Sequence, residues 1–393
     1  MPGTGRTFVI AGAGIAGMTL ALALAQSGAT VVVLERQAQV QEFGAGLQIS
    51  PNARKCLDRL GLAEALDRIG LEPQALDIYP QGGQKPLLSM ELGAIMRKRF
   101  GAPYMVMHRA DLADALYKAC RKNANIDILF GVRNWDVVSH TRGVTVSIDE
   151  ADGMTRTTRA EAFIGADGVH SHTRLAVLDG PRAQFRNRIA WRTLVPFDLV
   201  SGQIAPDRVS VFFGSGFHLV CYPLPHRGQV NLALFMPGTP ETTAQPRPAN
   251  PGPRVEAILA AAAQGWTAWP MYTVETGVWH KGNIGLVGDA AHAMVPFQAQ
   301  GAAMGIEDAT VLAACLLGTD STSAAFSRYA AHRQQRVRRV AALSARNGRI
   351  FHLPWPLSLA RDTVMRLQGP QAHLRRLDWV YAHDAAGQIG GPE

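Results

Sequence analysis

Two short apolar runs flank a longer alanine- and leucine-rich stretch at the start of this chain. Residues 8–11 are continuously apolar and predict a buried strand. An alanine- and leucine-rich stretch follows, long enough for a helix, and it is broken at Gly28. Residues 30–33 form a second, β-branched run that leads to Glu35. This order of strand, helix and strand predicts an α/β fold with a parallel sheet.

The middle of the chain predicts a helix–loop part followed by many strands. Glycines and a Ser-Pro-Asn sequence mark residues 43–53 as a loop, and Ser50 or Asn52 starts a helix that runs to Leu60. A second helix is expected at 111–120, and runs at 126–130, 143–148 and 156–163 predict the strands of a meander. Further strand-like runs lie at 76–89, broken by two glycines, and at 191–195, 209–213, 218–221 and 229–235.

The last part of the chain is mainly helical by its pattern. A segment rich in proline, threonine and asparagine at 237–253 is expected to be an exposed loop, and a strand is expected at 284–287. Everything beyond Gly301 predicts helix, with a break at 353–356. A length of 393 residues suits one large or two moderate domains.

The turn between the first strand and the first helix carries the glycine pattern of a dinucleotide-binding unit. Gly12 permits the tight turn, Gly14 lets the backbone approach a pyrophosphate, and Gly17 allows close packing of helix and strand. The helix start at Ile15 and Ala16 offers free N–H groups to phosphates. Glu35 lies about where a carboxylate accepts hydrogen bonds from an adenosine ribose. A glycine-rich turn in some other α/β protein is the alternative, and the spacing, the flanking runs and the acid together disfavour it.

Charge and cysteine content narrow the class of protein. The four cysteines are far apart and form no pair typical of a metal site or a redox disulfide, so reduced thiols and a cytoplasmic location are expected. No signal peptide and no membrane-spanning segment are expected, because the first apolar run already belongs to the glycine unit. The net charge is +8, and no acidic residue occurs between Asp320 and Asp362. The arginines of that stretch suit a nucleic acid or an anionic membrane, but a solvated helix face near a site for anionic ligands is favoured.

Two later motifs complete an ordered set with the glycine turn. They are the segments 165–168 (Gly-Ala-Asp-Gly) and 285–292 (Gly-Leu-Val-Gly-Asp-Ala-Ala-His). In order and spacing the three resemble the single-component FAD-dependent aromatic hydroxylases, above all salicylate hydroxylase and its relatives, the 6-hydroxynicotinate and 3-hydroxybenzoate hydroxylases. The resemblance covers nearly the whole chain and includes residues 108–112, 301–309 and 377–381.

The resemblance implies an architecture. It is a Rossmann-like FAD-binding domain of the p-hydroxybenzoate-hydroxylase type, a mixed β-sheet substrate domain and C-terminal helices. The expected FAD-binding domain is discontinuous and comprises residues 1–75, 104–180 and 280–320. Residues 76–103 and 181–279 form the expected substrate domain, and 321–393 the helical region.

The resemblance also implies the cofactor contacts. Asp289, a carboxylate at a strand end, suits the hydroxyls of a ribityl chain, and the helix start at Gly301 and Ala302 faces the flavin edge where negative charge develops. Arg109 and Asp167 match family positions near the flavin and the pyrophosphates. Simpler roles for these two are a surface residue at a helix start and a cap of the following turn; His292 suits a structural role as well as a catalytic one. The expected cofactor-binding residues are Gly12, Gly14, Ile15, Ala16, Gly17, Glu35, Arg36, Gln48, Arg109, Asp167, Gly288, Asp289, Pro296, Gly301 and Ala302.

The implied activity is oxygen insertion into a small aromatic substrate. Only one dinucleotide fingerprint is present, and in the family NADH or NADPH binds transiently in a groove to reduce FAD. Reduced FAD reacts with O2, and the resulting flavin C4a-hydroperoxide transfers oxygen to an electron-rich ring. The expected substrate is a hydroxylated aromatic or heteroaromatic carboxylate, and no metal is expected. The sequence leaves NADH or NADPH, the site of hydroxylation, and monomer or homodimer open.

Candidate substrate residues come from the strand-rich region and from the loop after Asp289. His218 and Tyr222 are in phase on a predicted strand, so both face one side; together they are the catalytic candidates, or else a pair of core aromatics. Many relatives carry histidine where Phe297 stands, and hydroxynicotinate-type relatives carry it where Gln48 stands. Those positions cannot deprotonate a phenol here, so His218 or Tyr222 takes the role or the substrate differs. The expected substrate contacts are Gln48, Phe213, His218, Tyr222, Pro296 and Phe297.

Other functions fit parts of the sequence less well. A flavin-dependent halogenase shares the fold, but the expected lysine is absent, and a disulfide reductase lacks its cysteine pair. A membrane-associated quinone-precursor ring hydroxylase and a non-catalytic FAD-binding protein stay open as alternatives. Neither binding to nucleic acid nor stable membrane insertion is expected.

Overall fold

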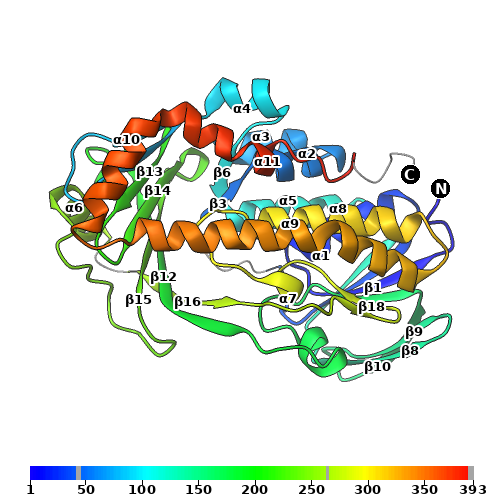
Figure 1. The fold of residues 1–393 in the computed structure, drawn as a ribbon. Coiled ribbons are helices and arrows are strands. Elements are labelled where there is room, and N and C mark those ends of the chain that lie inside the picture. Colours follow the sequence, from blue (N-terminus) through cyan, green and yellow to red (C-terminus); the bar gives the residue numbers. More distant parts are fainter. Residues whose placement is uncertain (41–45, 263–264, 388–393) are drawn as a thin grey trace.

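The computed structural model describes residues 1–40, 46–262 and 265–387. Two large sheets lie at opposite ends of the molecule, and the long helix α9 (Thr322–Phe351) runs from one to the other (Figure 1). The site described below lies where α9 and its neighbours bridge the two sheets.

The first sheet is the parallel sheet that the sequence predicted. In the described residues its strand order is β17-β18-β11-β1-β2-β7, and only β17 runs antiparallel to its neighbour. The central strand β1 is covered on both faces, which explains why Phe8, Val9 and Ile10 are all apolar and fully buried. The strands are β1 (Thr7–Ala11), β2 (Thr30–Glu35), β7 (Ile126–Phe130), β11 (Ala162–Gly165), β17 (His280–Lys281) and β18 (Ile284–Leu286).

The predicted meander is only partly right. Residues 126–130 form β7, which pairs with β2 at the edge of the parallel sheet. The run 156–163 divides at Glu161: the polar part before it is a meander strand, and the buried apolar part after it pairs with β1. The side chains change from polar and largely exposed to continuously apolar and buried at this point, because the chain passes from the meander into the parallel sheet, which is covered on both faces. The meander strands are β8 (Asn134–His140), β9 (Gly143–Asp149) and β10 (Thr155–Ala160).

The second sheet is mixed, as expected from the resemblance. Its order over the described residues is β16-β12-β15-β14-β13-β4-β5, and β13 and β4 are its parallel pair. Apolar clusters pack against both of its faces. Its strands are β4 (Ala75–Tyr79), β5 (Leu88–Glu91), β12 (Gln184–Pro196), β13 (Arg208–Phe213), β14 (His218–Leu224), β15 (Gln229–Pro237) and β16 (Thr267–Thr273).

Part of the predicted loop 43–53 is a strand in the structure, one half of a two-stranded ribbon. Strand β3 (Gly46–Ile49) pairs with β6 (Met105–His108), whereas residues 43–45 of that loop lie outside the described residues. The helix after it begins at Pro51 with Ser50 as its N-cap, one of the two predicted starts.

Helices pack on the parallel sheet, and α10 packs on the mixed sheet. Helix α1 packs against α5 and α8, α8 packs against α9, and α10 packs on β5. Helix α10 bends at Gly369, and the predicted break at 353–356 separates it from α9 (Figure 1). No described helix combines the length and the apolar character needed to cross a membrane. The remaining helices are α1 (Ile15–Gln26), α2 (Pro51–Arg59), α3 (Ala63–Ile69), α4 (Gly93–Phe100), α5 (Arg109–Arg121), α6 (Pro253–Ala261), α7 (Asp289–His292), α8 (Gly301–Leu317), α10 (Leu357–Arg376) and α11 (Asp378–Tyr381).

A buried ionic cluster joins α8 to α9. Arg333 bonds Glu307 through Nη1 at 2.6 Å and Asp308 through Nε at 2.7 Å, and Arg336 Nε bonds Glu307 at 2.7 Å. Burial opposes ionisation of Glu307, but Arg333 and Arg336 bring its pKa down to about 2. Burial likewise opposes ionisation of Asp308, and the adjacent His292 and Arg333 bring its pKa down to about 2. Two arginines of the basic stretch are therefore structural, which differs from the solvated helix face expected from the sequence.

The same two carboxylates reach beyond the helix pair. Asp308 accepts the backbone N–H of Gly288 at 3.0 Å and contacts His292. Glu307 accepts Asn52 Nδ2 at 2.7 Å. Three segments that are distant in sequence therefore meet at α8.

Replacing Arg333 by methionine is expected to destabilise the protein by about 3–5 kcal/mol, because it leaves buried carboxylate charge without its partner. Urea unfolding of the purified protein measures the change. The exposed Arg338, on the same helix, is the matched control, and Arg338→Met should change the free energy of unfolding by less than about 0.5 kcal/mol. Equal effects of the two substitutions would contradict a special role for the cluster.

Acid is expected to weaken the fold through the same carboxylates. Their folded-state pKa of about 2 lies below the ordinary values of 4.5 for Glu307 and 3.8 for Asp308. The unfolded chain therefore binds more protons between these limits, and the free energy of unfolding falls as the pH drops from about 4.5 towards 2. Urea titrations at several pH values in that window measure the slope. Glu307→Gln should make the slope shallower, and an unchanged slope in this variant would rule out the carboxylate as its source.

Candidate active site

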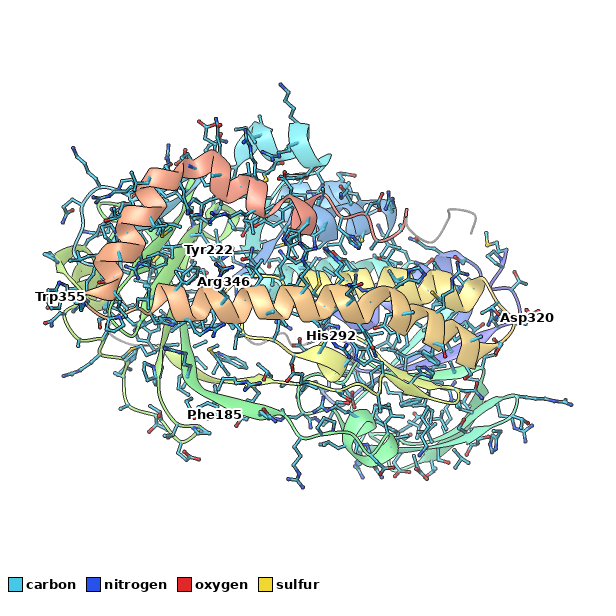
Figure 2. All side chains as sticks on the ribbon, in the orientation of Figure 1. Phe185, Tyr222, His292, Asp320, Arg346 and Trp355 are labelled. Carbon is cyan, nitrogen blue, oxygen red and sulfur yellow. The ribbon has the colours of Figure 1, made fainter. Side chains whose placement is uncertain are left out.

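A cavity of about 1060 Å³ connects the two sheets. It extends from the start of α1, past the turn after β18 and the start of α8, to one face of the mixed sheet and the inner side of α10. Tyr222 and Arg346 both line it, and Figure 2 shows them near the end of α9 that leads to Trp355. A volume of this size suits a large cofactor together with a small ligand.

The glycine turn forms one end of the cavity. Gly14 is the N-cap of α1, no side chain caps this helix, and its first turn holds no acid, so its N–H groups and positive dipole end stay available. Gly14, Ile15 and Ala16 line the cavity. Gly12 and Gly17 shape the turn from behind: Gly12 has φ +109°, and a Cβ on Gly17 would lie 2.0 Å from the Gly12 carbonyl oxygen.

Glu35 lies beside this turn at the end of β2. Its Oε2 accepts the N–H of Ala13 at 2.9 Å, and its Oε1 accepts the N–H of Gln37 at 2.8 Å. Each oxygen keeps a second lone pair, so the carboxylate can still accept ribose hydroxyls. Neither Glu35 nor Arg36 is among the described residues that line the cavity.

Asp167 caps the following turn and keeps one carboxylate oxygen without a partner, although it is not among the described residues that line the cavity. Its Oδ2 accepts the N–H of Thr173 at 2.9 Å and the hydroxyl of Thr173 at 3.0 Å, so it caps the following turn. Its Oδ1 is buried and has no hydrogen-bond partner among the described residues. An unpartnered buried acceptor next to the glycine turn fits a ligand hydroxyl or a bound water.

The turn after β18 and the start of α8 form the middle of the cavity. Gly288, Asp289, Pro296, Gly301 and Ala302 line it, as does Arg109 at the start of α5. The Asp289 carboxylate is exposed and makes no hydrogen bond or ion pair with another described residue. No side chain caps α8.

The surroundings of His292 fit the structural role considered for it. Its ring is buried and bonds Asp308, and it is not among the described lining residues. Figure 2 shows it beneath the middle of α9.

The mixed sheet supplies the far wall. His218, Val220 and Tyr222 of β14 all line the cavity, so the predicted common facing of His218 and Tyr222 is what the structure has. Beside them on β15 and β12, Phe235, Ala233 and Ala190 line the same face. This wall is therefore mostly apolar, with a few polar groups set into it.

Tyr222 is held tightly against β3. A Cβ on Gly46 would lie 2.2 Å from the Tyr222 hydroxyl oxygen, so only glycine allows this approach. Burial raises the pKa of the Tyr222 hydroxyl, although nearby Arg192 and Gln48 oppose the shift. Gln48 lines the cavity too, and its side-chain oxygen accepts a hydrogen bond from the hydroxyl of Tyr104.

His218 has a partner that the sequence did not reveal. Its Nδ1 lies 2.7 Å from Nε2 of His352, and its ring stacks on Phe235 with centroids 4.4 Å apart. Burial lowers the pKa of His218 well below its ordinary value, and burial lowers that of His352 to about 3, so both rings are neutral at neutral pH. His352 follows α9, 134 residues after His218, and no motif marks it.

The two predicted phenylalanine contacts differ in position. Phe297 lines the cavity and packs on the edge of His218. Phe213 does not line it: its ring stacks on Phe351 at 4.8 Å, and Arg361 lies 4.5 Å from its centroid. Phe213 pairs with His218 and so lies on the same face of the sheet, but residues at the junction of α9 and α10 cover it there. Tyr104, Arg192 and Trp269 line the cavity and were missed.

Comparisons with known proteins found a family model and relatives that cover most of this chain. The family described as "FAD binding domain" matches residues 6–194 and 243–344. A 3-amino-4-hydroxybenzoate 2-monooxygenase from Streptomyces platensis is 34% identical over 399 residues, which cover 96% of each chain. A 3-hydroxybenzoate 6-hydroxylase from Aquipseudomonas alcaligenes is 29% identical over 390 residues, with 96% of this chain and 98% of the relative covered.

The fold has a close counterpart among solved structures. The crystal structure of Klebsiella pneumoniae HpxO with FAD and uric acid has a TM-score of 0.83 and 24% identity, and 95% of each chain is covered. The matched family model spans well over half of the chain, and the first relative matches it almost from end to end. The chain therefore belongs to the FAD binding domain family and, within it, is a relative of the FAD-dependent aromatic hydroxylases.

Proposed function

We propose that this protein is an FAD-dependent monooxygenase that uses NADH or NADPH and O2 to hydroxylate a small hydroxylated aromatic or heteroaromatic carboxylate. The observation that carries the proposal is the continuous cavity, which has two uncapped helix starts at one part and an apolar sheet wall with His218 and Tyr222 at the other. The substrates in the names of the relatives, an aminohydroxybenzoate and a hydroxybenzoate, belong to this class.

The cofactor residues divide by the part of FAD that each would hold. The start of α1 takes the pyrophosphate, Glu35 the adenosine ribose, and Asp289 the ribityl hydroxyls. The start of α8 would stabilise the negative charge that the flavin gains on reduction, and Arg109 of α5 would help to hold the flavin. When bound, FAD supplies the redox chemistry that couples NAD(P)H oxidation and O2 reduction to oxygen transfer.

The sheet wall positions the substrate and keeps water away from it. Apolar side chains such as Val220, Phe235 and Phe297 surround the ring, and Pro296 shapes the passage towards the flavin. Phe297 and Gln48 cannot take a proton from a phenol. Burial keeps the His218 ring neutral and makes it a weak base, so it accepts a hydrogen bond from the substrate hydroxyl, and the protonated Tyr222 hydroxyl orients the same group.

The remaining expectations follow from the same proposal. FAD binds to residues 1–75, 104–180 and 280–320, the substrate wall comes from 76–103 and 181–279, and 321–393 closes the site. NAD(P)H visits the site transiently, and the protein acts in the cytoplasm as a monomer or a homodimer without nucleic acid.

The direct test is to purify the protein and to record its flavin spectrum. We expect a yellow protein that takes up FAD stoichiometrically. Hydroxybenzoates and hydroxypyridine carboxylates should stimulate NADH or NADPH oxidation, with a product that is heavier by one oxygen atom by mass spectrometry. A colourless protein that takes up no FAD on titration would refute the proposal. Bound FAD without stimulation by any ring compound would indicate a non-catalytic flavin protein.

Tyr222→Phe is expected to slow hydroxylation by about 10²-fold, because it removes the hydroxyl that orients the substrate. Single-turnover product formation measures the effect, and flavin absorbance should show unchanged FAD content. Tyr117→Phe is the control, since Tyr117 packs on Phe130 away from the cavity lining. Unchanged turnover in Tyr222→Phe would remove this residue from the mechanism.

A membrane-associated ring hydroxylase is a second candidate, supported by one surface observation. Trp355, Leu359 and Leu367, at the start of α10 and along it, are exposed, and arginines stand nearby in the sequence. Sedimentation with anionic phospholipid vesicles tests this candidate, and retention in the supernatant at low salt excludes it.

A further inference from the structure

Arg192 is an unusual residue of the cavity wall. It lies within β12, on the face that bears Ala190, and its neighbour across the sheet on β15 is Ala233. All three line the cavity. Two of its neighbours on this face are alanines, and Thr267 of β16 lies across from it on the other side, so small side chains flank the arginine along the wall.

Arg192 has no counter-charge within the described part of the protein. Its Nε–H is buried without a hydrogen-bond partner, and the side chain makes no ion pair or hydrogen bond with another described residue. Burial lowers the pKa of Arg192, although a guanidinium remains charged at neutral pH. A half-buried cation without a partner is costly to maintain, which points to an anion that arrives from outside the chain.

The fully buried arginines show how unusual this is. Arg54 bonds Asp58 and Asp67, Arg174 donates to three backbone carbonyls, and Arg333 bonds Glu307 and Asp308. Each of them has its charge or its N–H groups satisfied by the fold. Unlike these three arginines, Arg192 lines the cavity and has no such partner among the described residues.

A second donor without a partner lies next to it. Trp269 of β16 pairs with Ala190 of β12, lines the cavity, and has a buried indole N–H without a partner in the described structure. The acidic side chain among the described lining residues is Asp289, which lies beyond the parallel sheet strand β18. The mixed-sheet wall therefore presents a positive charge and an unpartnered donor, with no acidic side chain among its described lining residues, and such a wall favours an anionic ligand.

We propose that Arg192 binds the carboxylate of the aromatic substrate, with the Trp269 indole N–H as a second donor to the same group. This inference rests on the function proposed above and specifies the part of the substrate that each wall residue takes. Arg192 and Tyr222 lie two strands apart and two residues out of line on one face of the sheet, so their backbones are roughly 12 Å apart. Both side chains are long enough to reach opposite ends of one six-membered ring between them, so a carboxylate at Arg192 leaves the ring hydroxyl near Tyr222.

The test compares acids with their neutral amides on the FAD-bound protein. The probes are 3-hydroxybenzoate, 4-hydroxybenzoate, salicylate and 6-hydroxynicotinate, each with its carboxamide, and binding is followed by the change in flavin absorbance. For the acid that binds the wild type most tightly, Arg192→Gln should weaken binding by roughly 30-fold or more. Binding of the matching amide should change by less than about threefold, because the amide carries no charge. Arg192→Lys should recover part of the affinity for the acid.

Arg186→Gln is the matched control. Arg186 lies on the same strand, is exposed, and bonds Thr273 at 2.5 Å outside the cavity lining. Its loss removes one positive charge without touching the wall, and acid binding should stay within about twofold. Melting temperature and FAD content of each variant show whether it is folded.

The outcomes separate this inference from the proposed function. An Arg192→Gln variant that binds the acid as tightly as the wild type overturns the inference, as does an equal loss for acid and amide. In both cases acid-stimulated NADH oxidation by the wild type would leave the proposed function standing. A wild-type protein that binds FAD but none of the acids overturns the assignment of a carboxylate to Arg192 together with the proposed substrate class.

Discussion

The pair of charges buried in α8, Glu307 and Asp308, sets the frame of the site. Each carboxylate is out of contact with water, so each must be matched by cations and donors from elsewhere in the chain. Arg333 of α9, the Gly288 turn and Asn52 of α2 supply them. The need to satisfy two buried charges therefore fixes α9 and the Gly288 turn relative to the start of α8, and the cavity lies between these elements.

Three unpartnered polar atoms lie on the sheet wall or beside the glycine turn. Asp167 Oδ1, Arg192 Nε and Trp269 Nε1 have no hydrogen-bond partner among the described residues, and the same holds for some atoms away from the cavity, such as Asn231 Nδ2 and His292 Nδ1. Leaving a buried polar atom unpaired costs about 1–3 kcal/mol, and a ligand that completes the hydrogen bond removes that cost. The acceptor lies near the glycine turn and the donors lie on the sheet wall, in keeping with a cofactor at one part and an anion at the other.

Sequence patterns predicted local structure well where the conformation depends on a few residues that are adjacent in the chain. The glycine turn, the start of α2 after Ser50 and the common facing of His218 and Tyr222 follow from backbone conformation, a proline in the first helical turn and strand periodicity. The errors occurred where a neighbour in space decides. Residues 126–130 could have joined a meander or a parallel sheet, and Phe213 has the right phase but lies under the α9–α10 junction.

The sequence by itself determined the nucleotide-binding unit, the order of the motifs and so the family, because these depend on residues close together in the chain. Only the tertiary structure decided which side chains meet at the sheet wall. His352 bonds His218, and Arg192 pairs with Ala233 across the sheet without a counter-charge among the described residues, through contacts between segments far apart in sequence. Whether a polar group is satisfied depends on every neighbour in three dimensions, and no local pattern encodes that.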